Sequence, residues 1–167
     1  STNPHTIHAI NRNVDFDKLA GIVKQIKAGE NIHQHLDLIA GLPYEDYASF
    51  GRSFNDVYAL EPEQLQLGFL KVLKGSMLHQ KQKEYEIVCH DTAPYEVMTT
   101  HMLPYEDTLR LKYIEEMVET YYNSGRFLHT LMYLVPLYES PFAFYEALSQ
   151  FWLKEGCQYK YLSKIGL

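Results

Sequence analysis

Histidine and carboxylate side chains gather in one short stretch of this sequence, at a spacing that could support chemistry. His33 and His35 lie two residues apart, and Asp37 follows at the same interval. In an extended strand such residues point to one face, so two imidazoles and a carboxylate share one side. A metal ion needs three or four donors, and no later strand offers a matching set. We therefore predict no metal site and expect these groups to be hydrogen-bonded inside a polar lumen.

The stretch that carries these groups predicts a buried strand, a tight turn and a helix. Apolar residues recur at alternate positions from Ile32 to Leu38, and the strand ends at Gly41. Pro43 suits the first turn of a helix that we expect to run to about Ala59. A parallel strand covered on both sides should be apolar on both faces. The polar face therefore predicts a barrel lumen or a cleft that holds a ligand.

A second strand is predicted over residues 64–72, again with one apolar and one polar face. Two strands joined by a helix form a right-handed parallel β-α-β unit, the repeating piece of an α/β barrel or open sheet. In both architectures ligands bind at the carboxyl ends of the strands. Strand alternation therefore predicts four residues that line the substrate lumen: His35, Asp37, Gln66 and Gly68.

Helices are predicted before the first strand. Residues 4–10 form a short helix, for which Asn3 is the expected N-cap. A longer helix begins after Asp15, another good N-cap, and ends at Gly29.

The sequence changes in character after residue 76. A short helix is expected at 77–83, and residues 86–89 and 96–100 are predicted to pair as a hairpin within a linker. Beyond Pro104 the pattern is helical. The expected helices span about residues 105–124, 127–137 and 141–155. The resulting division is α/β for 1–76, linker for 77–103 and α-helical for 104–167.

The pentapeptide Leu-Pro-Tyr-Glu-Asp occurs twice, at residues 42–46 and 103–107. The sequences around the two copies are not similar, which argues against a duplicated domain. Proline in a first turn and acidic residues at the positive end of a helix suit a helix start. We therefore expect the same helix-start chemistry in both copies.

The composition excludes several classes of function. A net charge of -6 argues against nucleic acid as the main partner, because phosphate binding needs a basic surface. Cys89 and Cys157 are far apart, which excludes a disulfide scaffold and a cysteine-built metal site within this chain. We find no signal-peptide pattern and no membrane-spanning apolar run, and expect a cytoplasmic protein that meets no membrane.

Several segments resemble radical S-adenosylmethionine (SAM) enzymes. Asp-Leu-Ile-Ala-Gly-Leu-Pro at 37–43, followed by Glu45, is similar to the fifth-strand signature of that superfamily. Residues 1–4 resemble the end of the preceding strand, and residues 64–78 resemble the sixth strand and its loop. Tyr44 replaces the glycine that is common at this turn in the wider superfamily.

The closest resemblance is to bacterial radical SAM proteins that carry an N-terminal cobalamin-binding domain. Many of those are labelled anaerobic magnesium-protoporphyrin IX monomethyl ester oxidative cyclases. Residues 94–97 and 121–127 look like the C-terminal domain of uncharacterised function found on that group. The resemblance covers nearly the whole chain in the right order. Nothing in these residues selects a tetrapyrrole over another small-molecule substrate.

The resemblance implies a parent enzyme that cleaves SAM at a [4Fe–4S] cluster to give a 5′-deoxyadenosyl radical. The Cys-x-x-x-Cys-x-x-Cys loop that would hold the cluster is absent from this sequence, and a full barrel needs about 250 residues. We therefore expect the last strands of a TIM-type barrel followed by a helical region, continuing from a longer protein. Alone it would hold no catalytic residue, and its partners would be the barrel's N-terminal half and the cobalamin domain.

The resemblance also implies cofactor-binding residues. Ile39 and Gly41 would lie at the adenine of SAM, with Ser1 and Asn3 near the methionine or ribose.

Two alternatives from other classes remain open. One is a helical protein-interaction module without a catalytic role, in which the strands serve only as a packing platform. The other is a metal hydrolase that uses His33 and His35, which predicts stoichiometric zinc or manganese. If strands are missing, uncovered sheet edges also predict that the isolated chain self-associates as a homo-oligomer.

Overall fold

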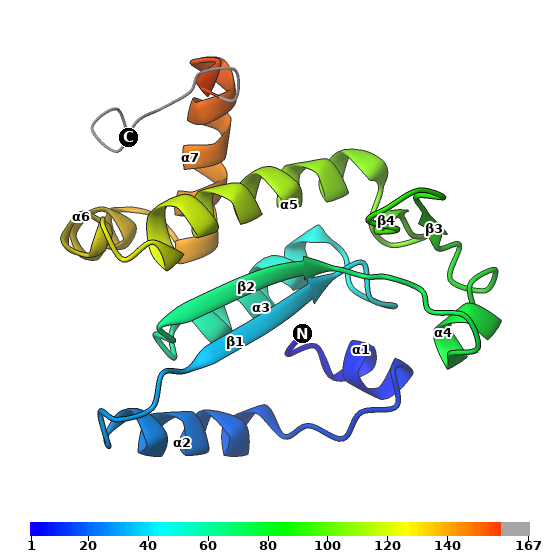
Figure 1. Cartoon of the computed structure of the whole chain (residues 1–167), viewed down its shortest axis with the longest axis horizontal. Coiled ribbons are helices and arrows are strands. Elements are labelled where there is room, and N and C mark those ends of the chain that lie inside the picture. The colour runs from blue at the N-terminus through cyan, green and yellow to red at the C-terminus, as the bar shows by residue number, and fades with distance from the viewer. Residues whose placement is uncertain (158–167) are drawn as a thin grey trace.

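A computed structural model of the chain describes residues 1–157 (Figure 1). The elements of the first half are α1 (Pro4–Ala9), α2 (Phe16–Lys27), β1 (His35–Ala40), α3 (Tyr47–Tyr58), β2 (Gln64–Phe69) and α4 (Met77–Gln80). Those of the second half are β3 (Val88–Cys89), β4 (Val97–Thr99), α5 (Tyr105–Met117), the π-helix η1 (Val118–Asn123), α6 (Leu128–Leu134), the 3-10 helix η2 (Val135–Leu137) and α7 (Pro141–Lys154). The predicted helices and strands are confirmed in order, with differences at their ends.

Local side chains start the first two helices as predicted. The Asn3 side chain accepts a hydrogen bond from the His5 amide at 3.0 Å, and Asp15 accepts one from the Lys18 amide at 3.1 Å. Each bond satisfies an amide that has no partner within the helix.

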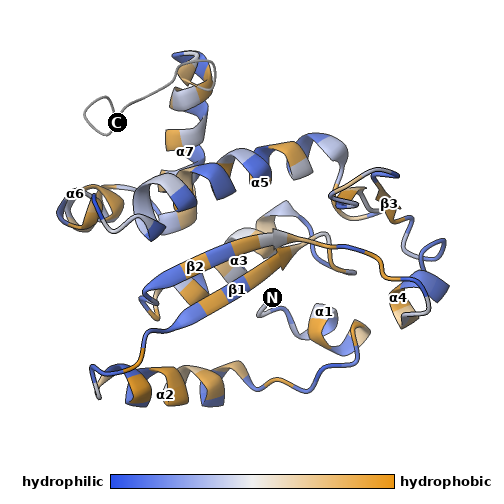
Figure 2. Ribbon diagram, viewed as in Figure 1, coloured by the Kyte–Doolittle hydropathy of each residue, from blue (hydrophilic) through white to orange (hydrophobic). Residues whose placement is uncertain are grey.

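The strands β1 and β2 are parallel, and α3 joins them as the predicted β-α-β unit. Their register runs from His35 opposite Gln64 to Ala40 opposite Phe69. Apolar and polar residues alternate along most of both strands (Figure 2), and Ile39 interrupts the pattern in β1. The apolar rows are buried on the side that holds α3, and the polar rows lie on the opposite side.

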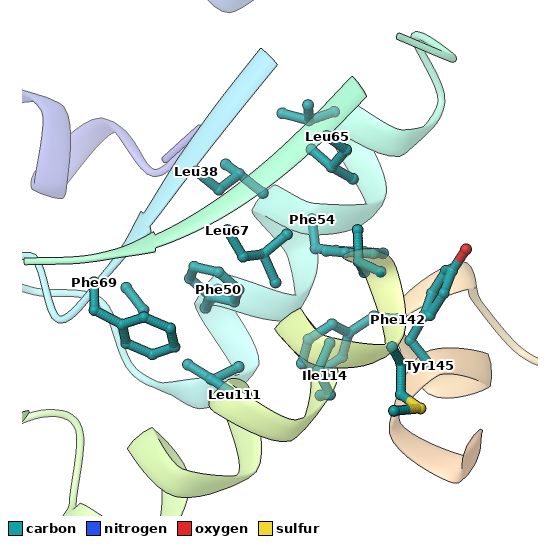
Figure 3. Close-up of a cluster of buried hydrophobic side chains, with 14 of the residues drawn as sticks. Leu38, Phe50, Phe54, Leu65, Leu67, Phe69, Leu111, Ile114, Phe142 and Tyr145 are labelled. Atoms are coloured by element: carbon teal, nitrogen blue, oxygen red, sulfur yellow. The ribbon is translucent and has the colours of Figure 1, made fainter. Parts of the chain in front are cut away.

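One hydrophobic core joins the β-α-β unit to the C-terminal helices. Figure 3 shows side chains from β1, α3 and β2 in contact with side chains from α5 and α7. The largest of them include Phe50, Phe54, Leu111, Ile114 and Tyr145. The residues on either side of the predicted linker therefore bury their apolar surfaces against each other.

The C-terminal region also closes the outer edge of β2. The Asn123 side chain accepts a hydrogen bond from the Leu65 amide at 2.9 Å and donates one to the Leu65 carbonyl at 3.0 Å. Farther along, the Val97 amide donates to the Leu70 carbonyl at 2.8 Å. Val97 belongs to the antiparallel pair β3–β4, which confirms the predicted hairpin. The Asn123 side-chain amide and Val97 of β4 thus occupy the edge at which a further strand of the parallel sheet would pair.

The ends of several elements differ from the predictions. Helix α3 begins at Tyr47 instead of Pro43, because Asp46 is its N-cap. The predicted helix at 105–124 changes to π-helix at Val118, and the one at 127–137 changes to 3-10 helix at Val135. The second strand ends at Phe69 instead of residue 72, and α4 is shorter than expected. The last part of the predicted 104–167 region, residues 158–167, lies outside the described residues.

Candidate functional site

The strand residues predicted to line a lumen lie together on one face of the small sheet. This open face consists of His35, Asp37 and Ile39 of β1 with Gln66 and Gly68 of β2. In the register, Asp37 lies opposite Gln66 and Ile39 opposite Gly68. His35 Nε2 lies 3.1 Å from Asp37 Oδ1. The arrangement offers hydrogen-bonding groups near one end and an apolar surface near the carboxyl end.

Gly68 is a glycine that the packing of this chain does not require. A Cβ atom at this position would meet only the Leu38 carbonyl oxygen, at the ordinary contact distance of 3.6 Å. A glycine inside a strand weakens the strand and often marks a place that a ligand or another backbone approaches closely. Gly68 therefore leaves space on the open face beside Ile39.

Gly41, predicted to lie at the adenine, is buried beneath β4. Its φ of 85° favours glycine, and a Cβ atom there would lie 2.6 Å from Val97 Cγ1. This glycine therefore allows β4 to approach the end of β1. It follows the last residue of β1 and lies two residues beyond Ile39, which remains 37 % exposed on the open face.

Ser1 and Asn3 lie beside the turn that follows β1. The Ser1 hydroxyl donates to Glu45 Oε1 at 2.6 Å. The Asn3 amide donates to the Tyr44 carbonyl at 2.9 Å and to the Ser49 hydroxyl at 3.0 Å. The structure thus brings Ser1, Asn3 and Gly41 to the same end of β1. Both polar side chains are engaged in holding the turn.

Glu45 is a buried carboxyl group, which the sequence had indicated as helix-start charge and as part of the strand signature but not as a buried residue. It is 1 % exposed, and its Oε1 accepts hydrogen bonds from the Ser1 and Ser53 hydroxyls. Burial raises the pKa of Glu45, although the two hydroxyl donors act in the opposite direction. Its place two residues after Gly-Leu-Pro was the available signal, but its burial depends on Ser53, which no local pattern connects to it.

Tyr44 adopts a backbone conformation that is unusual for its residue type. Its φ is 61°, in the left-handed region where glycine is favoured. Its ring meets Tyr85 edge-on at 5.7 Å between centroids and His101 at 6.1 Å. These rings and the Asn3 hydrogen bond hold the turn.

The site offers little to a metal ion. Among residues 1–157, no group of three or more His, Cys, Asp and Glu side chains could hold one. His33 precedes β1, and His35 is paired with Asp37. Burial raises the pKa of the Cys89 thiol.

No helix in the described part of the chain combines the length and apolar character needed to cross a membrane.

Comparison with known proteins assigns the second half of the chain. The family described as "Protein of unknown function (DUF4080)" matches residues 83–167, just over half of the sequence. The match includes β3, β4 and the helices that close the β2 edge. A search of curated proteins found no match.

Proposed function

The chain belongs to the DUF4080 family, whose function is unknown, and from this premise we propose that it is the C-terminal part of a radical SAM enzyme. The proposed parent is of the kind labelled magnesium-protoporphyrin IX monomethyl ester oxidative cyclase. The observation that carries the proposal is the open face that runs along two parallel strands, from His35 to Ile39 on β1 and over Gln66 and Gly68 on β2. The residues of this face occur in the order of the fifth- and sixth-strand signatures that the sequence resembles.

The exposed side chains of the open face support a binding role. Ile39 offers an apolar surface of the kind that an adenine ring contacts, and Gly68 leaves space next to it. His35, Asp37 and Gln66 provide donors and acceptors that would orient a polar substrate. Ser1 and Asn3 would act by holding the turn, since their side-chain hydrogen bonds are made within the chain.

The cofactors divide between this chain and the rest of the proposed polypeptide. When bound, SAM with a reduced [4Fe–4S] cluster would supply a 5′-deoxyadenosyl radical. The described residues lack a cysteine cluster, so the cluster ligands would come from another part of the enzyme, as would a cobalamin site. The contribution of this chain is to bind, orient and exclude water over the open face.

The proposal can be tested by filling the space at Gly68 in the full-length native protein. Gly68→Val adds a side chain that the strand accommodates, and it projects onto the open face. Gly21→Val is the matched control, because a Cβ atom at Gly21 in α2 meets nothing within 4 Å. We expect Gly68→Val to lower the rate of 5′-deoxyadenosine formation by about tenfold or more, with a normal melting temperature. Equal rates for the two variants would contradict a binding role for the open face.

A second candidate function, a protein-interaction module, is favoured by one surface. Leu128, Met132, Tyr133 and Leu137 of α6 and η2 are 57 % to 72 % exposed. Exposed apolar side chains in such a cluster often mark a protein contact. This alternative predicts that the full-length protein forms neither cluster nor 5′-deoxyadenosine. It also predicts that the protein associates through this surface. The double variant Met132→Lys, Leu137→Lys should abolish that association in sedimentation, while the melting temperature stays unchanged.

A further inference from the structure

A cavity of about 570 Å³ lies between α1, the turn after β1 and the segment that begins with α4. Its walls come from residues within 4–11 and 77–85 and from Tyr44, so it is distinct from the open face on β1 and β2. The volume is in the range of sites that hold a small organic molecule. The turn lies at the carboxyl end of β1, the end at which α/β proteins bind their ligands. Volume and position therefore both fit a ligand site.

Tyr44 forms an aromatic wall of this cavity. Its φ of 61° lies in the left-handed region, which is unfavourable for a residue with a side chain and which glycine adopts more easily. Tyr44 is 44 % exposed, and its ring meets Tyr85 at an interplanar angle of 76° and His101 at 90°. Neither neighbour stacks in parallel on it, so a planar ligand in the cavity could do so. Backbone strain of this kind occurs often at sites that hold a ligand.

Lys81 provides positive charge in the same cavity. Its Nζ lies 5.7 Å from the centroid of the Tyr85 ring and 3.8 Å from Glu84 Oε2. The Tyr85 hydroxyl and the Glu84 carboxylate raise the pKa of Lys81, so its ammonium group keeps its charge at neutral pH. His5 and His8 lie three residues apart on α1 and add two imidazoles to the lining.

The segment around Lys81 is basic, although the chain as a whole is acidic. Residues 71–83 contain four lysines and no aspartate or glutamate, in a chain with a net charge of -6. Such a concentration of positive charge attracts anions. Within the cavity, the Glu84 carboxylate offsets the charge of Lys81 in part. This balance suits the single charge of a carboxylate better than the double charge of a phosphate group.

We propose that this cavity binds a small aromatic carboxylate, with its ring against Tyr44 and its carboxylate at Lys81. The imidazoles of His5 and His8 supply further hydrogen-bond donors for the ligand. The inference rests on the proposed function only for the role of this molecule as the substrate, because its binding depends on residues of this chain. It also gives a reason for tyrosine at position 44, since glycine would fit the backbone but leave the cavity without this ring.

The test measures binding to the full-length native protein by isothermal titration calorimetry, without SAM. The probe is 2-naphthoate, and 2-naphthalenemethanol is the matched compound that carries the same rings without a charge. We expect 2-naphthoate to bind with a Kd below about 1 mM. The uncharged compound should bind about tenfold more weakly, because it forms no charge-assisted contact with Lys81.

Two pairs of variants identify the site. Tyr44→Gly removes the ring and suits the left-handed backbone, and it should weaken 2-naphthoate binding by about tenfold. Tyr95→Gly is its matched control, because Tyr95 is also exposed, has a φ of 59° and lies in the β3–β4 hairpin. Lys81→Met should reduce 2-naphthoate binding to the level of the uncharged compound. Lys83→Met, at an exposed lysine two residues away, should leave it unchanged.

Three outcomes would overturn the inference. They are the absence of 2-naphthoate binding to the native protein, equal binding of the two naphthalene compounds, and equal effects of Tyr44→Gly and Tyr95→Gly. The titration involves neither SAM nor a cluster. A protein that binds 2-naphthoate through Tyr44 and Lys81 but forms no 5′-deoxyadenosine would contradict the proposed function alone.

Discussion

The two copies of Leu-Pro-Tyr-Glu-Asp have the same sequence and different structures. Both begin with a buried leucine, Leu42 or Leu103. In residues 103–107, Pro104 is the N-cap and the helix starts at the tyrosine, as predicted. In residues 42–46, the tyrosine has a positive φ, the glutamate is buried, and the aspartate is the N-cap. The expectation of the same helix-start chemistry in both copies is therefore wrong for the first.

Contacts from distant residues explain the difference. Around the first copy, Asn3 bonds to the Tyr44 carbonyl, and the Ser1 and Ser53 hydroxyls bond to Glu45. Around the second copy, Glu106 is exposed to solvent. These contacts thus hold an irregular turn between the carboxyl end of β1 and the start of α3. The comparison teaches that the turn at the candidate site depends on its partners more than on its five residues.

The largest expected effect comes from the residue before the first copy. Gly41→Ala combines a left-handed backbone with a Cβ atom 2.6 Å from Val97 Cγ1. We expect it to lower the free energy of unfolding by about 2 to 4 kcal/mol. Met102→Ala, at the equivalent place before the second copy, should cost about 1 kcal/mol. Urea denaturation of both variants makes the comparison, and equal losses would contradict this account.

Removing the buried glutamate should distinguish the copies next. Glu45→Ala leaves the Ser1 and Ser53 hydroxyls without their acceptor in a buried site. The expected loss in unfolding free energy is about 2 to 3 kcal/mol. Glu106→Ala, on the surface, should change it by less than about 0.5 kcal/mol. Guanidinium titrations can measure both. Comparable values for the two glutamates would show that the hydroxyl contacts do not stabilise the turn.

Glu45 and Glu106 should also differ in how their contribution to the free energy of unfolding depends on pH. Burial raises the pKa of Glu45 above its ordinary 4.5, so the folded state holds this proton more tightly than the unfolded state. The stabilisation that comes from the protonated Glu45 side chain is fully present below pH 4.5 and is lost as the pH rises through the raised pKa. Glu45→Gln should therefore gain stability relative to the native protein over that rise, by about 1.4 kcal/mol per unit of pKa shift. Glu106→Gln is the control; a gain there as well, or none at Glu45, would contradict the assignment.

The smallest effect separates the two aspartates. Asp46 accepts a hydrogen bond from the Ser49 amide at 2.7 Å, and Asp107 pairs with Arg110 at 2.8 Å on the surface. Loss of a capping bond costs about 1 kcal/mol, whereas an exposed ion pair contributes about 0.5 kcal/mol or less. Thermal unfolding of Asp46→Ala and Asp107→Ala should preserve this order. Asp46→Asn should retain most of the stability.

Much of the fold could be predicted because its signals are local. Asn3 and Asp15 cap their helices through bonds two and three residues along the chain. Alternation along the strands separated the open face from the core before any contact was known. The turn at Tyr44 and the π-helix that ends at Asn123 were missed. Both are accompanied by contacts across more than forty residues, to Asn3 and Leu65 respectively, which no periodic pattern reports.

In the candidate site too, local patterns could be predicted from the sequence and contacts between distant residues could not. Strand spacing placed His35 and Asp37 on the same side as Gln66 and Gly68. The burial of Gly41 depends on Val97, more than fifty residues away, and could not be read from the motif around it.

Expression of the full-length native gene under anaerobic conditions, with assays for a cluster and for SAM cleavage, tests the proposed radical SAM function. We expect about four irons per chain with matching sulfide, and 5′-deoxyadenosine formed from SAM on reduction. A well-folded full-length protein that contains no cluster and forms no 5′-deoxyadenosine would contradict it. The interaction-module function would then be the leading explanation for this family.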